Sequence, residues 1–265
     1  MAKKTFIVSD SHFYLDNKPD NSRRLKVFID FLKENAGEMN QLFLLGDIFD
    51  FWFEWNHVIP KYNFELLYFL KKMTSEMGIK ITYITGNHDF YLGSFFEKNL
   101  GIDCVDHDFE LLIGDKKHLL THGDGKIDND KGYRILRKIL RSKISNFLFK
   151  NFIHPDMGVM IAKFTSGSSR KYNGRLKSSI DESYMDYCKS KIDEGYDGVI
   201  IGHIHCPQKY TYNDSTIVNS GDWINYYSFV IIDSEEISLN YYKHSLIDDI
   251  KREKILSELI SNQER

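Results

Sequence analysis

The sequence predicts an α/β protein that contains two β-sheets. Strand–helix–strand units recur through the first part of the chain, and such units place their strands in a mostly parallel sheet. Further along, the expected strands 109–113 and 117–122 are joined by Gly114-Asp115, which is typical of a hairpin and predicts a second, more antiparallel sheet. The 265 residues can bury one sizeable core, so we expect a single domain that spans residues 1–265.

The individual elements follow from apolar runs and from helical spacing. Strand 5–10 leads into a polar loop, after which Ser22 can cap a helix with apolar residues at three- and four-residue spacing. Strand 42–45, a helix at 63–77 and strand 79–85 follow. The second sheet is expected to receive the closing strands 209–212, 216–219, 228–233 and 237–241, and a last amphipathic helix is expected at 246–260.

Five of the expected strands end in side chains that can bind metal ions. In chain order, the motifs are Asp10-Ser11-His12, Gly46-Asp47-Ile48-Phe49-Asp50, Gly86-Asn87-His88-Asp89, His122-Gly123-Asp124 and Gly202-His203-Ile204-His205. The ends of strands in α/β sheets build sites at one edge, so we expect these side chains to gather there. Turn capping explains any one such Asp or His, but it does not explain five sets together. Oxygen and imidazole donors without cysteine favour Mn²⁺, Fe or Zn²⁺ at an open site.

The order of these five motifs resembles that of the calcineurin-like metallophosphoesterase superfamily. The resemblance implies a four-layer αββα sandwich of two mixed sheets. It also implies two divalent metal ions, with Mn²⁺ expected first, that activate water for attack on phosphorus and are bridged by Asp47. The other ligands implied by the resemblance are Asp10, His12 and His205 for one ion, and Asn87, His122 and His203 for the other.

The same resemblance suggests roles for residues beside the ligands. His88 follows a metal-binding Asn, so its imidazole can reach the leaving oxygen and donate a proton or stabilise charge there. His88 is therefore a catalytic candidate together with Asp47 and Asn87. Asp50 and Asp89 are interpreted as groups that orient the ligands.

The loop after the second motif is rich in aromatic residues at 51–55. One interpretation is core packing beneath the loop. The other is an apolar wall near the metals. The sequence leaves both open.

Residues 126–177, inserted between the fourth and fifth motifs, contain no strand signal and are expected to form a helical lid. Within 131–150 there is no acidic residue, and the basic residues are Lys131, Arg134, Arg137, Lys138, Arg141, Lys143 and Lys150. Apolar residues recur among them at helical spacing, which is typical of a surface for an anionic membrane or an acidic partner. The alternative is an ordinary cap helix with a solvated basic face. A second helix is expected at 157–165.

After the His122-Gly123-Asp124 motif the insertion carries Asp130, Tyr133, the Arg-rich segment, and Gly167-Ser168-Ser169 with Asn173 and Lys177. In these blocks it resembles the UDP-2,3-diacylglucosamine pyrophosphatases of lipid A synthesis. This resemblance implies hydrolysis of a lipid-linked UDP-sugar to UMP and 2,3-diacylglucosamine 1-phosphate (lipid X), with a lid that holds the acyl chains. The implied substrate contacts are Asn87, His88, Asp130, Tyr133, Ser169, Asn173, Lys177 (or Arg175) and His203. Proteobacterial members carry Arg at the position of His88, so this chain replaces a permanent phosphate clamp with a titratable group.

Composition limits the remaining possibilities. Lys and Arg total 35 against 38 for Asp and Glu, a net charge of −3, so no nucleic-acid partner is expected. Three separated cysteines suggest reduced thiols in the cytosol. A strand begins directly after residues 1–4, which leaves no room for a signal peptide, and no apolar run approaches the roughly 20 residues that span a bilayer. We therefore expect a cytoplasmic protein that is peripheral on the inner face of the cytoplasmic membrane.

Two other functions remain open at this point. The first is a metallophosphoesterase that acts on another phosphodiester, such as a nucleotide or a nucleic-acid end. The second is a non-catalytic scaffold on the same fold, which the presence of every expected ligand disfavours.

Overall fold

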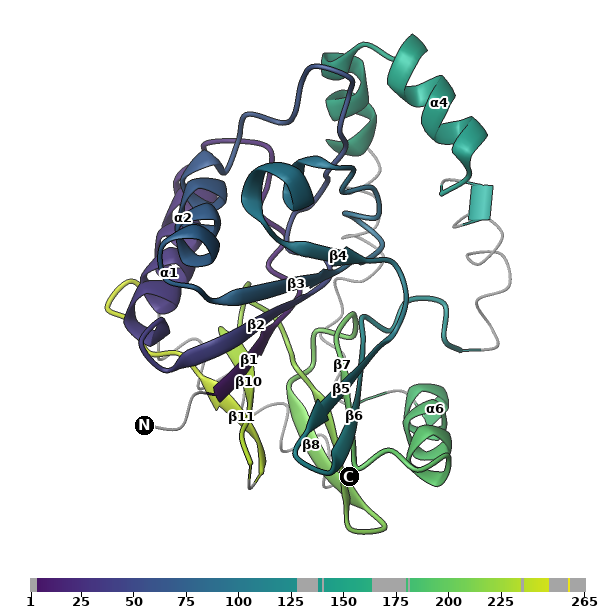
Figure 1. Ribbon diagram of the computed structural model, residues 1–265. Coiled ribbons are helices and arrows are strands. Elements are labelled where there is room, and N and C mark those ends of the chain that lie inside the picture. Colours follow the sequence, from purple (N-terminus) through teal and green to yellow (C-terminus); the bar gives the residue numbers. More distant parts are fainter. Residues whose placement is uncertain are drawn as a thin grey trace.

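The computed structural model describes residues 4–127, 138–139, 141–163, 180, 182–234, 236–247 and 257. These residues form two mixed sheets that pack face to face (Figure 1). Helices α1 (Pro19–Asn35) and α2 (Phe64–Ser75) cover the outer face of the first sheet, and α6 (Glu182–Asp193) covers that of the second. The expected αββα layering is confirmed.

The first sheet has six strands in the order β11-β10-β1-β2-β3-β4. The strands are β1 (Lys4–Val8), β2 (Met39–Leu45), β3 (Lys80–Ile84), β4 (Asp103–Val105), β10 (Ser228–Ile232) and β11 (Ile237–Tyr241). Strands β1 to β4 run parallel, while β10 and β11 run antiparallel to their neighbours. The assignment of 228–233 and 237–241 to the second sheet is therefore wrong. Alternation of apolar residues predicts a strand, but it does not say which sheet contains its partner.

The second sheet has five strands in the order β5-β6-β7-β9-β8. The strands are β5 (Phe109–Ile113), β6 (Lys116–Thr121), β7 (Gly198–Ile201), β8 (Gln208–Tyr212) and β9 (Ser215–Asn219). The hairpin expected at Gly114-Asp115 is confirmed, because β5 and β6 pair antiparallel on either side of it. Strands β6, β7 and β9 are parallel to one another.

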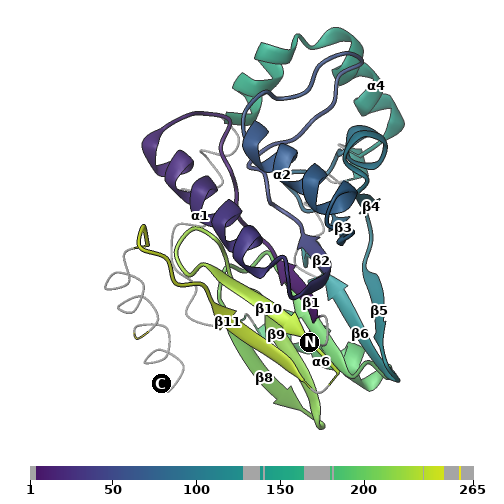
Figure 2. The ribbon, with the colours of Figure 1, turned by 60° about the vertical axis from the view of Figure 1, so that its left-hand side comes forward.

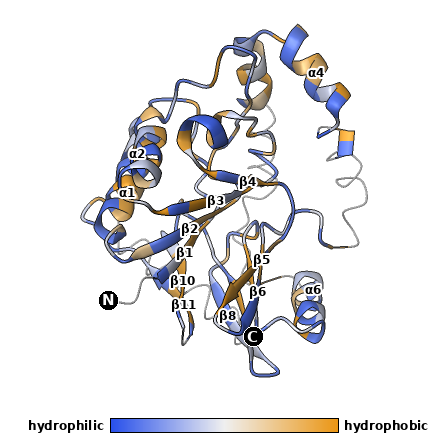
Figure 3. Cartoon of the chain, viewed as in Figure 1, coloured by the Kyte–Doolittle hydropathy of each residue, from blue (hydrophilic) through white to orange (hydrophobic). Residues whose placement is uncertain are grey.

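Three apolar clusters fill the three spaces between the four layers. Along β2, Leu42 and Leu44 pack toward α1 and α2, whereas Phe43 and Leu45 pack toward the second sheet. Successive side chains of a strand point to opposite faces, so a strand buried on both faces is apolar throughout. Figure 3 shows apolar residues along the inner strands of both sheets.

Some element boundaries differ from the expectation. Helix α1 begins at Pro19, three residues before Ser22, because proline lacks the amide hydrogen that the first turn of a helix leaves unpaired. The three-residue strand β4, helix α6 and a short π-helix, η1 (Phe96–Leu100), were not expected.

The described part of the insertion is helical. Helix α4 (Lys143–Phe152) follows Ser142, whose Oγ accepts a hydrogen bond from Ser145 N at 3.1 Å, and residues 155–163 are also helical. Parts of the expected helices 131–150, 157–165 and 246–260 lie outside the described residues. In both ribbon views α4 lies at the opposite end of the molecule from α6 (Figures 1 and 2). Among the described helices, none is long and apolar enough to cross a bilayer.

Candidate active site

Six parallel strands, three from each sheet, end at the same place in the fold. The polar residues that follow β1, β2 and β3 are Asp10, His12, Asp47, Asn87 and His88, and those that follow β6, β7 and β9 are His122, His203, His205 and Asp222. The structure thus brings together all seven residues that the sequence predicts as ligands. Neighbouring parallel strands end at one edge of their sheet, and the two sheets are packed together.

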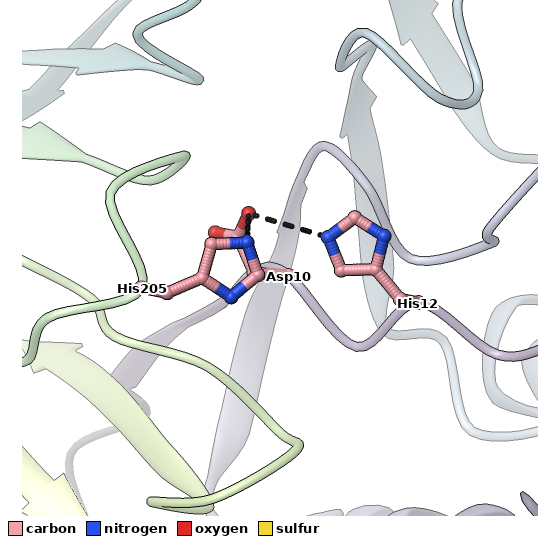
Figure 4. Close-up of side chains that lie close together, drawn as sticks. All are labelled: Asp10, His12 and His205. Atoms are coloured by element: carbon pink, nitrogen blue, oxygen red, sulfur yellow. Dashed lines mark ion pairs between the residues drawn. The ribbon is translucent and has the colours of Figure 1, made fainter. Parts of the chain in front are cut away.

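The first group of donors is Asp10, His12 and His205 (Figure 4). Asp10 Oδ1 lies 3.4 Å from His205 Nε2 and 3.9 Å from His12 Nε2. Asp10 Oδ1 and His12 Nε2 are buried and have no hydrogen-bond partner among the described residues. Buried polar atoms are nearly always satisfied, so an unsatisfied carboxylate oxygen beside two imidazoles fits a divalent cation.

The second group is Asp47, His122 and His203, with Asn87 beside it. His122 Nε2 lies 3.2 Å from Asn87 Oδ1 and 3.4 Å from Asp47 Oδ2. The same oxygen of Asp47 lies 3.6 Å from His12 Nε2 in the first group. Asp47 therefore stands between the two groups, where a bridging carboxylate would stand.

His88 is fixed on both its backbone and its ring. Its backbone N–H donates to Asp47 Oδ1 at 2.8 Å, and its Nδ1 lies 2.9 Å from the carbonyl oxygen of Asp50. This contact favours the tautomer with the proton on Nδ1 and leaves Nε2 as the atom that can reach a ligand. The carboxylate of Asp50 lies 3.7 Å from His12 Nδ1 and 3.8 Å from His88 Nδ1, between the two rings.

The backbone of the predicted ligands is unusual. Nine non-glycine residues in the described chain have positive φ, and five of them are predicted ligands: Asp10, His12, Asp47, His203 and His205. Such conformations are uncommon outside glycine and persist only where the surroundings fix them. Here the loops after β1 and β2 are held to each other by Asp10 N donating to Gly46 O at 3.1 Å and His12 N donating to Asp47 O at 2.9 Å.

Two glycines allow the loops to approach this closely. A Cβ at Gly86 would lie 2.1 Å from Asp47 Oδ1, and a Cβ at Gly46 would lie 2.5 Å from His122 Nδ1. Gly46 also has φ +79°, a conformation that other residues rarely adopt. Each glycine is therefore required for the position of a neighbouring predicted ligand.

Asp89 is buried and accepts hydrogen bonds from two motifs at once. Its Oδ1 accepts from Gly86 N at 2.9 Å and from Asp47 N at 3.1 Å. Its Oδ2 accepts from Ile48 N at 2.8 Å and from the Tyr83 hydroxyl. These contacts agree with the interpretation that Asp89 orients the ligands.

Asp222 is a site residue that the sequence reasoning missed. Its Oδ2 lies 3.3 Å from His205 Nδ1, so it sets the orientation and tautomer of that ring. Its Oδ1 accepts from the backbone amides of Ile224, Asn225 and Tyr226. The signal was present, because Gly221-Asp222 follows a buried strand in the same way as Gly46-Asp47 does.

The histidines of the site have pKa values shifted in opposite directions. Burial lowers the pKa of His203 to about 3 and also lowers the pKa of His12, so both rings are neutral and offer a lone pair. Burial opposes protonation of His122, but the Asp47 carboxylate outweighs it and raises the pKa of His122 to about 10. Burial also opposes ionisation of Asp47, and His122 nevertheless holds the pKa of that carboxyl well below its usual range. Cations that bind here would replace protons.

The aromatic residues of the loop at 51–55 do not all have the same role. Trp52 belongs to the core beneath the loop. The ring centroids of Phe53 and Trp55 lie 4.6 and 5.9 Å from that of Phe149 in α4, and Trp55 Nε1 donates to Ile153 O at 2.9 Å. The loop that carries Asp50 therefore also holds the insertion.

The remaining predicted substrate contacts, Asp130, Tyr133, Ser169, Asn173 and Lys177 with its alternative Arg175, lie outside the described residues. They stay predictions.

A family model described as calcineurin-like phosphoesterase matches residues 3–207, which include all seven predicted ligands. The chain belongs to this family. As a calcineurin-like phosphoesterase it is a metal-dependent hydrolase, in agreement with the two groups of Asp and His side chains.

Several curated relatives align with nearly the whole chain, and each is named UDP-2,3-diacylglucosamine hydrolase. The relative from Porphyromonas gingivalis is 26% identical, with 90% of this chain and 97% of its own covered by the alignment. The Haemophilus influenzae protein is 27% identical, with 91% and 99% covered, and the Shewanella loihica protein is 28% identical, with 89% and 95% covered. Among solved structures, an archaeal phosphodiesterase aligns with 90% of this chain and 99% of its own, at 17% identity and a TM-score of 0.46.

Proposed function

We propose that this phosphoesterase hydrolyses the pyrophosphate bond of UDP-2,3-diacylglucosamine and releases UMP and 2,3-diacylglucosamine 1-phosphate. The observation that carries the proposal is the extent of the match with relatives of that name. The alignment covers 90% of the chain, so at least part of the insertion, residues 126–177, must lie within it. Phosphoesterases with different substrates share catalytic loops, so substrate choice is expected to reside in segments such as this one.

The described part of the insertion has a surface suited to acyl chains. Fourteen large apolar side chains are exposed in the described chain, and eight of them lie between residues 139 and 161. They are Ile139, Ile144, Phe147, Leu148, Phe152, Met157, Met160 and Ile161. Each methylene that a ligand buries against such a surface contributes about 0.8 kcal/mol, so two acyl chains can supply much of the binding energy. We propose that the insertion acts as a lid over the acyl chains.

In this proposal each part of the site has a separate task. When bound, two divalent ions, for which we propose Mn²⁺, supply a water nucleophile and neutralise charge on the phosphoryl oxygens. Asn87 and His203 contact those oxygens. His88, held through Nδ1 by the carbonyl of Asp50, presents Nε2 to the leaving oxygen and, in its doubly protonated form, donates the Nε2 proton there. Acyl chains bound to the lid position the pyrophosphate over the catalytic loops, which raises the rate without any contact at phosphorus.

We also propose that the enzyme works at the inner face of the cytoplasmic membrane. The described residues between 138 and 163 include five cations, Lys138, Arg141, Lys143, Lys150 and Lys163, but only one acid, Asp156. A basic surface beside exposed apolar side chains is attracted to anionic lipid. The Lys143→Glu, Lys150→Glu double variant should sediment less with vesicles that contain phosphatidylglycerol, and the difference should shrink at high salt.

The substrate proposal is tested with the Mn²⁺-loaded protein and three substrates. We expect UDP-2,3-diacylglucosamine to be hydrolysed with a far higher kcat/KM than UDP-N-acetylglucosamine or bis(p-nitrophenyl) phosphate, with UMP as a product identified by mass spectrometry. Phe147→Asp should lower turnover of the acylated substrate far more than that of bis(p-nitrophenyl) phosphate. The matched control is Phe64→Asp in α2, since the exposed fractions of the two side chains are 61% and 66%.

Two outcomes would contradict the proposal. Wild-type protein that does not hydrolyse the acylated substrate would contradict it directly. A parallel loss of both activities in Phe147→Asp, with Phe64→Asp unaffected, would show that the insertion supports the catalytic loops and does not select an acylated ligand.

A further inference from the structure

A cavity of about 680 Å³ opens directly beside the second group of donors. His122, one of the predicted metal ligands, forms part of its wall, so a ligand that reaches the metals from this side occupies the cavity as well. The volume lies within the range of about 300–1,000 Å³ that is typical of small-molecule sites. None of the residues that the preceding section assigns to the acyl chains lines it.

Most of the side chains that line this cavity are polar or charged. Of the twelve described residues that line it, only Ile84 has an apolar side chain. The exposed apolar side chains of the insertion, residues 144–161, are absent from the wall. The cavity therefore offers many more hydrogen-bonding groups to a ligand than the apolar side chains of the insertion do.

Lys138 and Arg141 are two of the three cations of the insertion that line this cavity. Arg141 Nη2 donates to Gly86 O at 2.9 Å and its Nη1 donates to Asp106 O at 3.2 Å, so its guanidinium is fixed next to the loop that carries Asn87. Lys138 is exposed and forms no ion pair with the described residues. An anionic group between the second metal position and these side chains would gain charge-assisted hydrogen bonds.

The third cation in the wall, Lys126, already has a partner. Its Nζ lies 2.7 Å from Asp108 Oδ2, and Asp108 also accepts from the hydroxyl groups of Thr121 and Tyr187. This network supplies carboxylate and hydroxyl groups at the cavity wall. Such groups suit ribose hydroxyls and the edges of a base better than they suit a second phosphate.

We propose that this cavity binds the nucleoside monophosphate half of the substrate, with Lys138 and Arg141 beside its phosphoryl group. A nucleotide linked through pyrophosphate to an acylated sugar has a polar half and an apolar half. The polar cavity and the apolar surface of the insertion provide a separate place for each. That the occupant is a nucleotide with uracil as its base rests on the proposed function, whereas recognition of a phosphoryl group with polar substituents rests on the cavity.

The proposal is tested by titrating Mn²⁺-loaded protein with UMP and, separately, with uridine, which lacks the phosphoryl group, in a calorimeter. Lys138→Glu should raise the Kd of UMP about tenfold, the effect of losing one charge-assisted contact, and should change the Kd of uridine much less. Lys138→Arg should retain the affinity for UMP. Lys143→Glu is the matched control, because it makes the same charge change on an exposed residue of the insertion that does not line the cavity.

Equal effects of Lys138→Glu and Lys143→Glu on UMP affinity, or no effect of either, would overturn the proposal. These outcomes are independent of the proposed reaction. If wild-type protein hydrolyses UDP-2,3-diacylglucosamine while UMP affinity ignores Lys138, the cavity assignment alone is wrong. If the acylated substrate is not hydrolysed while UMP affinity depends on Lys138, the substrate is wrong and a nucleotide-binding cavity remains.

Discussion

The loops at the strand ends and the helices of the insertion differ in burial and in how firmly hydrogen bonds hold them. The loops are buried, and their backbone is fixed by hydrogen bonds from one motif to the next, such as those that end on Asp89. Helix α4 has no fully buried residue. Among the described residues it contacts the catalytic loops mainly through Phe149 and through the carbonyl of Ile153.

This difference matches the proposed division of roles, in which the buried loops catalyse the reaction and the insertion selects the substrate. Metal ligands must be held within a fraction of an ångström, and the strained backbone at five of the predicted ligands shows that the surrounding fold enforces the positions of these residues. A surface that receives flexible acyl chains needs apolar area and little fixed geometry. Substitutions in the two regions should therefore have different signatures: loss of all turnover in the loops, and loss of preference among substrates in the insertion.

The largest effect is expected at Asp47, the carboxylate between the two groups of donors. Asp47→Ala removes the carboxylate that we propose binds both ions, and it should reduce turnover by at least about 10⁴-fold, or roughly 5 kcal/mol of transition-state stabilisation. Elemental analysis should show fewer than two ions per chain. Asp115→Ala, which removes an exposed carboxylate in the β5–β6 turn, is the control. A folded, fully active protein without metal would end the dinuclear interpretation.

The next effect concerns His88, whose ring nitrogen faces the leaving group in the proposed mechanism. His88→Ala should lower kcat about 10²–10³-fold on diphenyl phosphate, because general-acid catalysis matters most for a poor leaving group. The loss on bis(p-nitrophenyl) phosphate should be much smaller, since p-nitrophenolate departs without a proton. Equal losses on the two diesters would instead assign His88 to the positioning of phosphate.

The sequence could predict the features of the catalytic loops that depend on neighbouring residues in the chain. Each catalytic motif is local, because an apolar run followed directly by Gly, Asp or His specifies both a buried strand and the donor at its end. The pattern placed Asp10, Asp47, Asn87 and His122 at strand ends, and the family resemblance then identified them as the expected ligands. Asp222 has the same signal, and it was missed because no metal role had been assigned to the strand before it.

Features that depend on distant partners were harder to predict. Strand β10 pairs with β1 across more than two hundred residues of sequence, from Thr5 opposite Ile232 to Ile7 opposite Val230. Its own alternation is equally compatible with either sheet. The cavity beside His122 could not be predicted at all, since its wall combines strand ends, the turn at Asp106 and three cations of the insertion.

A smaller effect is expected from Asp222, which orients a predicted ligand without being one. Asp222→Asn keeps an oxygen for the three backbone amides but can replace the acceptor that faces His205 with an NH₂ group. Loss of such a partner typically lowers metal affinity 10–100-fold. Titration with Mn²⁺ should show one weakened site and one unchanged site. Two equally weakened sites would mean that Asp222 supports the whole edge of the sheet and not the single ring.

The smallest effect is expected where the two regions meet, at Trp55. Its indole N–H donates to Ile153 O at 2.9 Å, and Trp55→Phe removes this bond while it keeps an aromatic ring against Phe149. A net hydrogen bond contributes about 1 kcal/mol, so local opening of α4 should become about fivefold more frequent. Hydrogen–deuterium exchange should then accelerate at the amides of α4 and stay unchanged in β1, β2 and β3. Tyr68→Phe, which removes an exposed hydroxyl from α2, serves as the control. Equal acceleration in α4 and in the loops after β1 and β2 would show that the two regions open as one unit. The proposed distinction between rigid catalytic loops and a flexible insertion would then be wrong.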